Sequence, residues 1–188
     1  MGWLPKHVRL IKWLAEHPEE DRFKHQFLDK NPSKALLELG ISAGQVVLDF
    51  GCGSGTYTIP AAKLVGKGGR VYALDINSSF LDRIEEMAKN EGLKNIVRID
   101  VSGEEKIHID NEAVDVILVI DVLHLIDDRP TLFDEAYRIL KQGGLLIVYP
   151  MHVTEKEVEE LATSRNLSLE EKKFQGHILI YRKPKEHD

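Results

Sequence analysis

The chain alternates between short apolar runs and longer segments in which apolar residues recur at helical spacing. The short runs predict strands at residues 46–48, 71–74, 96–99, 114–120, 145–149 and 176–182. The helical segments lie at residues 32–40, 57–65, 78–90, 129–140 and 154–164, and the fourth is expected to stop at Gly143–Gly144. Unbroken apolar runs suit strands buried on both faces. The pattern therefore predicts an α/β fold with a mostly parallel sheet and helices on both of its faces.

The first thirty residues precede this alternation and form a separate prediction. Leu4, Val8, Ile11 and Leu14 follow helical spacing, so an amphipathic helix is expected to end near residues 17–18. We predict that residues 1–30 form a helical lid, residues 31–183 the main domain and residues 184–188 a frayed tail. Deleting the residues before 31 should then spare folding but weaken function.

Composition excludes several classes of protein. With 188 residues, 43% of them hydrophobic and 30% charged, the chain suits one globular domain. A net charge of -6 disfavours binding to a nucleic acid backbone. The single cysteine, Cys52, cannot form an intramolecular disulfide, and residues 1–20 lack the continuous apolar stretch of a signal or membrane helix. A cytoplasmic location is expected.

A glycine-rich turn follows the first predicted strand and carries the strongest functional signal. It reads Asp49-Phe-Gly-Cys-Gly-Ser-Gly55, with glycines at 51, 53 and 55 that let the backbone approach a ligand closely. A dinucleotide fingerprint would place its third glycine at Thr56, one residue later. The Asp49 carboxylate would repel a diphosphate and attract a cation. The turn therefore favours a cationic nucleoside over a dinucleotide.

This pattern resembles the D/E-x-G-x-G-x-G motif of class I methyltransferases. The resemblance extends from about residue 32 to residue 149 and is closest to enzymes of the ubiquinone-biosynthesis type. It includes the segment from Asp121 to His124 and a turn at residues 138–148. The resemblance implies a Rossmann-like, seven-stranded sheet whose last strand is antiparallel. It also implies an enzyme that uses S-adenosylmethionine as its cofactor.

The resemblance also assigns roles to residues at the ends of successive strands. Asp75 is expected to hold both ribose hydroxyls and Ile76 to lie against the adenine. Asp100 is expected to accept from the adenine amino group, although a helix cap is its simpler role. Asp121 is expected to contact either the methionine moiety or the substrate. The complete set predicted to contact the cofactor is Asp49, Gly51, Cys52, Gly53, Tyr57, Asp75, Ile76, Asp100, Val101 (through its backbone N–H) and Asp121.

Histidine and cysteine side chains are the remaining candidates for reactive groups. His124 is a candidate general base for the methyl acceptor, and its alternative role is packing or capping at a helix start. Cys52 has no basic neighbour in sequence, which indicates packing and not nucleophilic attack. His25, His108 and His152 have no partner at metal-ligand spacing, so no metal site is predicted.

The acceptor of the methyl group is the least determined property. Position 121 begins Asp-Val-Leu-His in place of the N/D-P-P-Y/F motif of exocyclic-amine methylation, and no large insertion is present. A small-molecule acceptor is therefore the first expectation. A non-catalytic cofactor-binding subunit and a protein or RNA methyltransferase remain alternatives. An NAD-dependent oxidoreductase is disfavoured, because it would need a catalytic domain and the wider glycine spacing.

Overall fold

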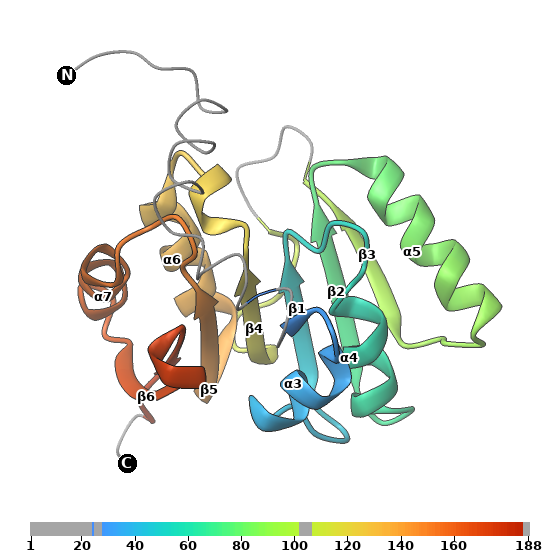
Figure 1. Cartoon of the computed structure of the whole chain (residues 1–188), viewed down its shortest axis with the longest axis horizontal. Coiled ribbons are helices and arrows are strands. Elements are labelled where there is room, and N and C mark those ends of the chain that lie inside the picture. Colours follow the sequence, from blue (N-terminus) through green and yellow to red (C-terminus); the bar gives the residue numbers. More distant parts are fainter. Residues whose placement is uncertain (1–23, 25–27, 102–106, 186–188) are drawn as a thin grey trace.

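A computed structural model describes residue 24 and residues 28–101 and 107–185. This part of the chain forms one seven-stranded sheet with helices on both faces (Figure 1). The strands are β1 (Val46–Phe50), β2 (Arg70–Asp75), β3 (Ile96–Asp100), β4 (Val114–Ile120), β5 (Leu140–Tyr149), β6 (Ser168–Lys173) and β7 (Ile178–Arg182). The helices are α3 (Pro32–Glu38), α4 (Thr58–Val65), α5 (Ser78–Asn90), α6 (Arg129–Ile139) and α7 (Glu155–Thr163), with 3₁₀ turns η2 (Leu123–Leu125) and η3 (Phe174–Gly176).

The strand order is β3-β2-β1-β4-β5-β7-β6. Strands β1 to β5 pair in parallel, whereas β7 is antiparallel to both β5 and β6. The predicted mostly parallel sheet with an antiparallel last strand is confirmed. Strand order reverses between β1 and β4, and ligands of open parallel sheets bind beyond the carboxyl ends of the strands at such a point.

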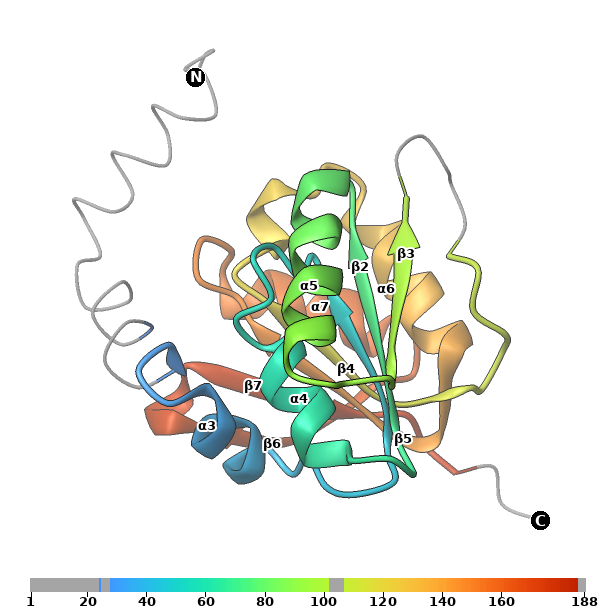
Figure 2. The same ribbon diagram turned by 90° about the vertical axis from the view of Figure 1, so that its right-hand side faces the viewer.

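The two faces of the sheet are covered by different helices. Val47, Val71 and Val116 belong to one core cluster with residues of α3 and α4. Leu48 and Ile117 point the other way and pack with α6 and α7, because successive side chains of a strand alternate between its faces. Helix α5 lies on the same face as α4, over β2 and β3 (Figure 2). The core therefore has two layers, which explains the unbroken apolar runs of the central strands.

Two helices begin at a side chain that caps the first turn. Asn31 accepts a hydrogen bond from the N–H of Lys34 at 3.1 Å, and Pro32 occupies the first turn of α3. Thr154 accepts from the N–H of Glu157 at 3.2 Å at the start of α7. Both caps satisfy a backbone donor that the first helical turn leaves without an intrahelical partner.

The helix predicted at residues 129–140 is confirmed to within one residue, but Gly143–Gly144 are not what ends it. Helix α6 ends at Ile139, and β5 begins at the next residue and runs through both glycines. Leu140 pairs with Val114, and the register then shifts, so that the glycines occupy an irregular part of the ladder. Tertiary pairing with β4 therefore overrides the local stop signal.

The predicted helix ending near residues 17–18 lies outside the described residues. Leu28, however, is fully buried in the core cluster that contains α3 and α4. Leu28 thus packs against the core of the described domain, although it precedes the predicted boundary at residue 31. In the described part of the chain, no helix has the length and apolar content needed to cross a membrane.

Candidate functional site

The glycine turn connects β1 to α4 at the carboxyl end of the sheet. Gly51, Gly53 and Gly55 have φ angles of 72°, 50° and 86°, a region that other residues rarely adopt. The N–H groups of Gly51 and Cys52 both donate to the carbonyl of Leu74, at 2.8 and 3.0 Å. The turn is thus fixed to the end of β2 as well as to β1.

The three glycines differ in what surrounds them. A Cβ on Gly51 would lie 2.4 Å from Cγ2 of Val122, and one on Gly55 would lie 2.8 Å from Cγ1 of Ile84. A Cβ on Gly53 would meet nothing within 4 Å. The outer two glycines therefore permit close packing inside the protein, whereas the middle one borders open space that a ligand can reach.

Asp49 lies behind this turn with its side chain almost fully buried. Thr58 donates to Oδ2 of Asp49 at 2.6 Å. Burial raises the pKa of Asp49 from its ordinary value of 3.8 to about 6, the Thr58 hydrogen bond opposes the rise, and the Asp75 charge adds to it. A nearby cation would stabilise the ionised form of this buried carboxylate.

Asp75 ends β2 and is held by the backbone. Its Oδ2 accepts from the N–H of Gly53 at 2.9 Å, and its Oδ1 accepts from the N–H of Asn77 at 2.9 Å. A carboxylate oxygen has two acceptor sites, so each oxygen can accept one further hydrogen bond from a ligand hydroxyl. The next residue, Ile76, is a large apolar side chain with 73% of its surface exposed, available to a planar apolar group.

The predicted adenine contacts at the end of β3 are engaged within the protein. Asp100 is exposed and lies 3.6 Å from an Arg98 guanidinium nitrogen. The N–H of Val101 donates to the carbonyl of Asp75 at 3.3 Å. Adenine would have to share this N–H with a backbone carbonyl, so the contact between Val101 and adenine stays a prediction.

Tyr57 and Cys52 are buried members of the predicted set. The hydroxyl of Tyr57 donates to Oδ1 of Asp29 at 2.7 Å, which connects the turn to the segment before α3. Cys52 packs with Ile59 and Leu81, and burial raises the pKa of its thiol. Its interpretation as a packing residue agrees with this environment.

A second group of side chains lies beyond β4 and β5. Asp121, which has a φ of 56°, contributes a carboxylate whose Oδ2 lies 2.7 Å from Nζ of Lys24. The rings of His124 and His152 meet edge to face, with their centroids 4.3 Å apart. One ligand atom from each of Asp121, His124 and His152 lies within 4.8 Å of the other two. The statement that His152 lacks a partner at metal-ligand spacing is thus corrected.

Burial lowers the pKa of His124 to about 4. Nearby positive charge from His152, Arg129 and Lys24 acts in the same direction, and Asp121 opposes it. His124 is therefore neutral near pH 7, but a conjugate acid with so low a pKa stores a substrate proton poorly. Its predicted role as a general base stays a prediction.

Comparison with known proteins decides the family. The model of the methyltransferase domain family matches residues 48–148, more than half of the chain. The chain belongs to the class I methyltransferase family. The matched residues run from the end of β1 to the end of β5 and include the glycine turn, Asp75 and the Asp121–His124 segment.

Individual methyltransferases agree with this assignment. The chain is 31% identical over 123 residues to the ubiquinone/menaquinone biosynthesis C-methyltransferase UbiE of a Marinomonas species, covering 65% of this chain and 49% of that protein. The demethylmenaquinone methyltransferase of Lactobacillus johnsonii is 29% identical over 111 residues, covering 59% and 46%. The chain thus spans about half the length of these relatives. A crystal structure of a SAM-dependent methyltransferase from Aquifex aeolicus superposes with a TM-score of 0.70 at 26% identity, covering 81% of this chain and 88% of that one.

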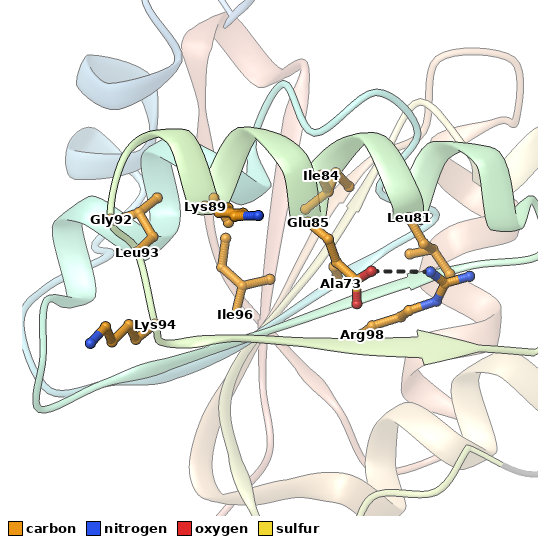
Figure 3. A pocket seen from close by; sticks show the side chains of 11 residues that line it. Ala73, Leu81, Ile84, Glu85, Lys89, Gly92, Leu93, Lys94, Ile96 and Arg98 are labelled. Carbon is orange, nitrogen blue, oxygen red and sulfur yellow. Dashed lines mark hydrogen bonds and ion pairs between the residues drawn. The ribbon is translucent and has the colours of Figure 1, made fainter.

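A pocket of about 340 Å³ lies elsewhere in this methyltransferase domain, under α5 (Figure 3). Leu81 and Ile84 line it from the helix, and Ile96 and Arg98 line it from β3. None of the residues predicted to contact the cofactor borders it. The pocket is therefore separate from the glycine turn and from the other residues predicted to contact the cofactor.

Proposed function

We propose that the chain binds S-adenosylmethionine at the glycine turn and catalyses transfer of its methyl group to a small-molecule acceptor. The observation that carries the proposal is the pairing of the open side of Gly53 with the fixed carboxylate of Asp75, whose Oδ2 accepts from the Gly53 N–H. A carboxylate that can accept hydrogen bonds from ribose hydroxyls thus lies beside a backbone segment with no side chain to block a ligand. When bound, S-adenosylmethionine supplies a methyl group on a positively charged sulfur.

Each residue around the turn has a distinct role in this proposal. Asp75 accepts from the ribose hydroxyls through the remaining acceptor sites of its two oxygens. Ile76 presents its exposed side chain to the adenine, and Asp100 accepts from the amino group after releasing Arg98. Asp49, buried behind the turn, stabilises the positive charge of the cofactor through space. The protein mainly aligns the reactants and excludes water, so no catalytic triad is needed.

A small acceptor is favoured by the names of the relatives. The Marinomonas protein is named for ubiquinone and menaquinone biosynthesis and the Lactobacillus protein for demethylmenaquinone, both small organic molecules. The segment after β4 carries Asp121 and His124, and the segment after β5 carries His152, which lies beside them. We propose that these segments contact the acceptor.

Calorimetric titration with S-adenosylmethionine and with NAD tests cofactor choice. Binding of S-adenosylmethionine alone is expected, and Asp75→Ala should weaken it at least tenfold, because two ribose hydrogen bonds are lost. Asp110→Ala, at an exposed aspartate outside the crevice, is the matched control and should leave affinity unchanged. Circular dichroism checks that Asp75→Ala is folded, since Asp75 also binds two backbone N–H groups. Binding of NAD in place of S-adenosylmethionine would overturn the proposal.

The acceptor is identified by incubating the protein with cofactor carrying a labelled methyl group. Fractionated metabolites, total protein and total RNA are supplied as three separate pools. Label in a small-metabolite fraction is the expected result. Label in protein or RNA alone would replace the acceptor class, and binding without any transfer would indicate a non-catalytic subunit.

A further inference from the structure

The segments that follow β4 and β5 bring together three side chains that are distant in sequence. Ile120 and Tyr149 are paired neighbours at the carboxyl ends of these two parallel strands. The chain turns beyond each of them, which places Asp121 and His124 beside His152. His152 lies 28 residues after His124, so no local sequence motif predicts that the three side chains come together.

Two imidazoles and one carboxylate form a donor set suited to a divalent transition metal. Zinc binds histidine nitrogen and carboxylate oxygen at roughly 2.0–2.2 Å, so two donors of one tetrahedral ion lie about 3.4 Å apart. The three donor atoms here already lie within 4.8 Å of one another. Side-chain rotations that close the group by about an ångström would complete the geometry.

We propose that Asp121, His124 and His152 bind a divalent transition metal ion of the zinc type. This proposal departs from the sequence-based expectation that no metal is bound. The two rings meet edge to face and do not stack, and one nitrogen of each lies within 4.8 Å of the other and of an Asp121 carboxylate oxygen. All three residues are partly exposed, so a metal ion can enter from solvent.

Lys24 is the competitor for this site. Its ammonium lies 2.7 Å from Oδ2 of Asp121 and 3.5 Å from Oδ2 of Asp29, so it already neutralises the carboxylate that the metal would use. A divalent ion beside this ammonium is repelled, and binding must displace Lys24 toward Asp29. Metal affinity is therefore expected to increase when the positive charge of Lys24 is removed.

The position of the site suggests its use, and this step rests on the proposed function. Val122, adjacent to Asp121, packs against Gly51 of the glycine turn. The site thus lies beside the crevice proposed for the cofactor. A metal with three protein ligands keeps an open position, as catalytic zinc sites do. That position would bind and polarise an anionic oxygen of the acceptor, such as a phenolate or enolate.

Titration of chelator-treated protein with Co²⁺ and Zn²⁺, in the absence of S-adenosylmethionine, tests the site. Co²⁺ is expected to produce the visible absorption of a low-coordinate nitrogen and oxygen site, with one equivalent bound. Zn²⁺ should displace it. His124→Ala and His152→Ala should each weaken binding at least tenfold, because a donor bond is lost in each. Lys24→Met should strengthen it at least threefold.

The control variant is His108→Ala, which removes an exposed histidine outside the group. It should bind Co²⁺ as the unchanged protein does. Absence of the absorption band, or equal binding by the double variant His124→Ala/His152→Ala after circular dichroism shows it to be folded, would overturn the proposal. Asp75→Ala should retain the metal while losing S-adenosylmethionine, so failure of the metal site and failure of the proposed function are distinguishable.

Discussion

At the scale of single residues, Gly51 is a point of close contact between the glycine turn and the segment after β4. An added Cβ would lie 2.4 Å from Cγ2 of Val122, in a backbone conformation with φ of 72°. We expect Gly51→Ala to destabilise the protein by about 1–2 kcal/mol through strain and about 1–3 kcal/mol more through overpacking. Gly40→Ala is the control, since Gly40 has a φ of 91° and nothing within 4 Å of its added Cβ. Urea unfolding compares the two variants.

Overpacking at Gly51 can be separated from strain by a second substitution. Val122→Ala removes both Cγ atoms that face the added methyl group. The double variant Gly51→Ala/Val122→Ala should therefore be less destabilised than the sum of the two single variants. Additive effects would show that the contact with the Cγ atoms of Val122 is not the cause, since the Cβ of residue 122 remains in both backgrounds.

The raised pKa of Asp49 predicts that the free energy of unfolding depends on pH. Its pKa rises from 3.8 to about 6 on folding, so between these values the folded state binds more protons than the unfolded state. Stability from this group is then highest below about pH 4 and falls as pH rises to about 6, by up to roughly 3 kcal/mol for two pKa units. Cys52, Tyr57 and Asp75 are the titratable groups coupled to it.

Asp49→Asn tests this dependence, because an amide keeps the acceptor for Thr58 and removes the buried charge. We expect the stability of Asp49→Asn relative to the unchanged protein to increase between pH 4.5 and pH 7.5 in urea unfolding. Asp110→Asn, at an exposed aspartate, should show no such trend. A relative loss of stability on going to pH 7.5 would contradict the buried-charge argument.

Sequence identified the residues of the glycine turn because their spacing is local. Asp49 and the glycines lie within seven consecutive residues, and Asp75 ends a recognisable strand. His152 carried no such signal, since strand pairing alone brings it to His124. The engagement of the Val101 N–H by the Asp75 carbonyl was also beyond sequence, because it depends on the register of β2 and β3.

At the scale of elements, the start of α7 offers a measurable cap. Thr154 accepts from the Glu157 N–H, and α7 buries Val158 and Ala162 behind it. We expect Thr154→Ala to lower the free energy of unfolding by about 1 kcal/mol, since a first-turn donor loses its acceptor. Thr163→Ala is a matched control on the same helix, because its exposed hydroxyl donates to the carbonyls of Glu159 and Glu160, which are backbone acceptors, and caps no N–H. Thermal unfolding should place Thr163→Ala within about 0.5 kcal/mol of the unchanged protein.

Equal destabilisation by Thr154→Ala and Thr163→Ala would contradict the capping argument. The comparison is informative because both substitutions remove the same atoms from α7. They differ in whether the hydroxyl oxygen accepts from a backbone N–H that lacks an intrahelical partner.

The sequence predicts the buried strands, because burial makes their residues apolar. It does not predict an exposed strand, whose residues are not constrained in this way. The central strands β1 and β4 are apolar because helices cover both faces of the sheet there, and β7 is buried along most of its length. Edge strand β6, with the sequence Ser-Leu-Glu-Glu-Lys-Lys, is largely exposed and shows no apolar run. Pairing with β7 makes it a strand, and a charged composition protects an exposed edge from further pairing.

At the scale of the whole molecule, the segment before α3 is part of the domain. Leu28 is 0% exposed, and Asp29 accepts from the Tyr57 hydroxyl of the glycine turn. Lys24 reaches Asp121 beyond β4. The segment therefore touches both halves of the sheet edge at which the cofactor is proposed to bind. Hydrophobic periodicity could not predict these contacts, because a single buried residue such as Leu28 forms no repeating pattern.

This anchoring changes the expected outcome of deleting the residues before 31. The sequence predicts that folding would be spared, whereas loss of Leu28 would leave a cavity against α3 and α4. We expect Leu28→Ala to lower the free energy of unfolding by about 2–5 kcal/mol, the range for a buried leucine. Leu37→Ala, at a leucine that is 56% exposed on α3, should cost less than about 1 kcal/mol. Urea unfolding measures the stability of both variants. A similarly small decrease in the free energy of unfolding for both would show that the core does not depend on Leu28, and would support a domain that starts at residue 31.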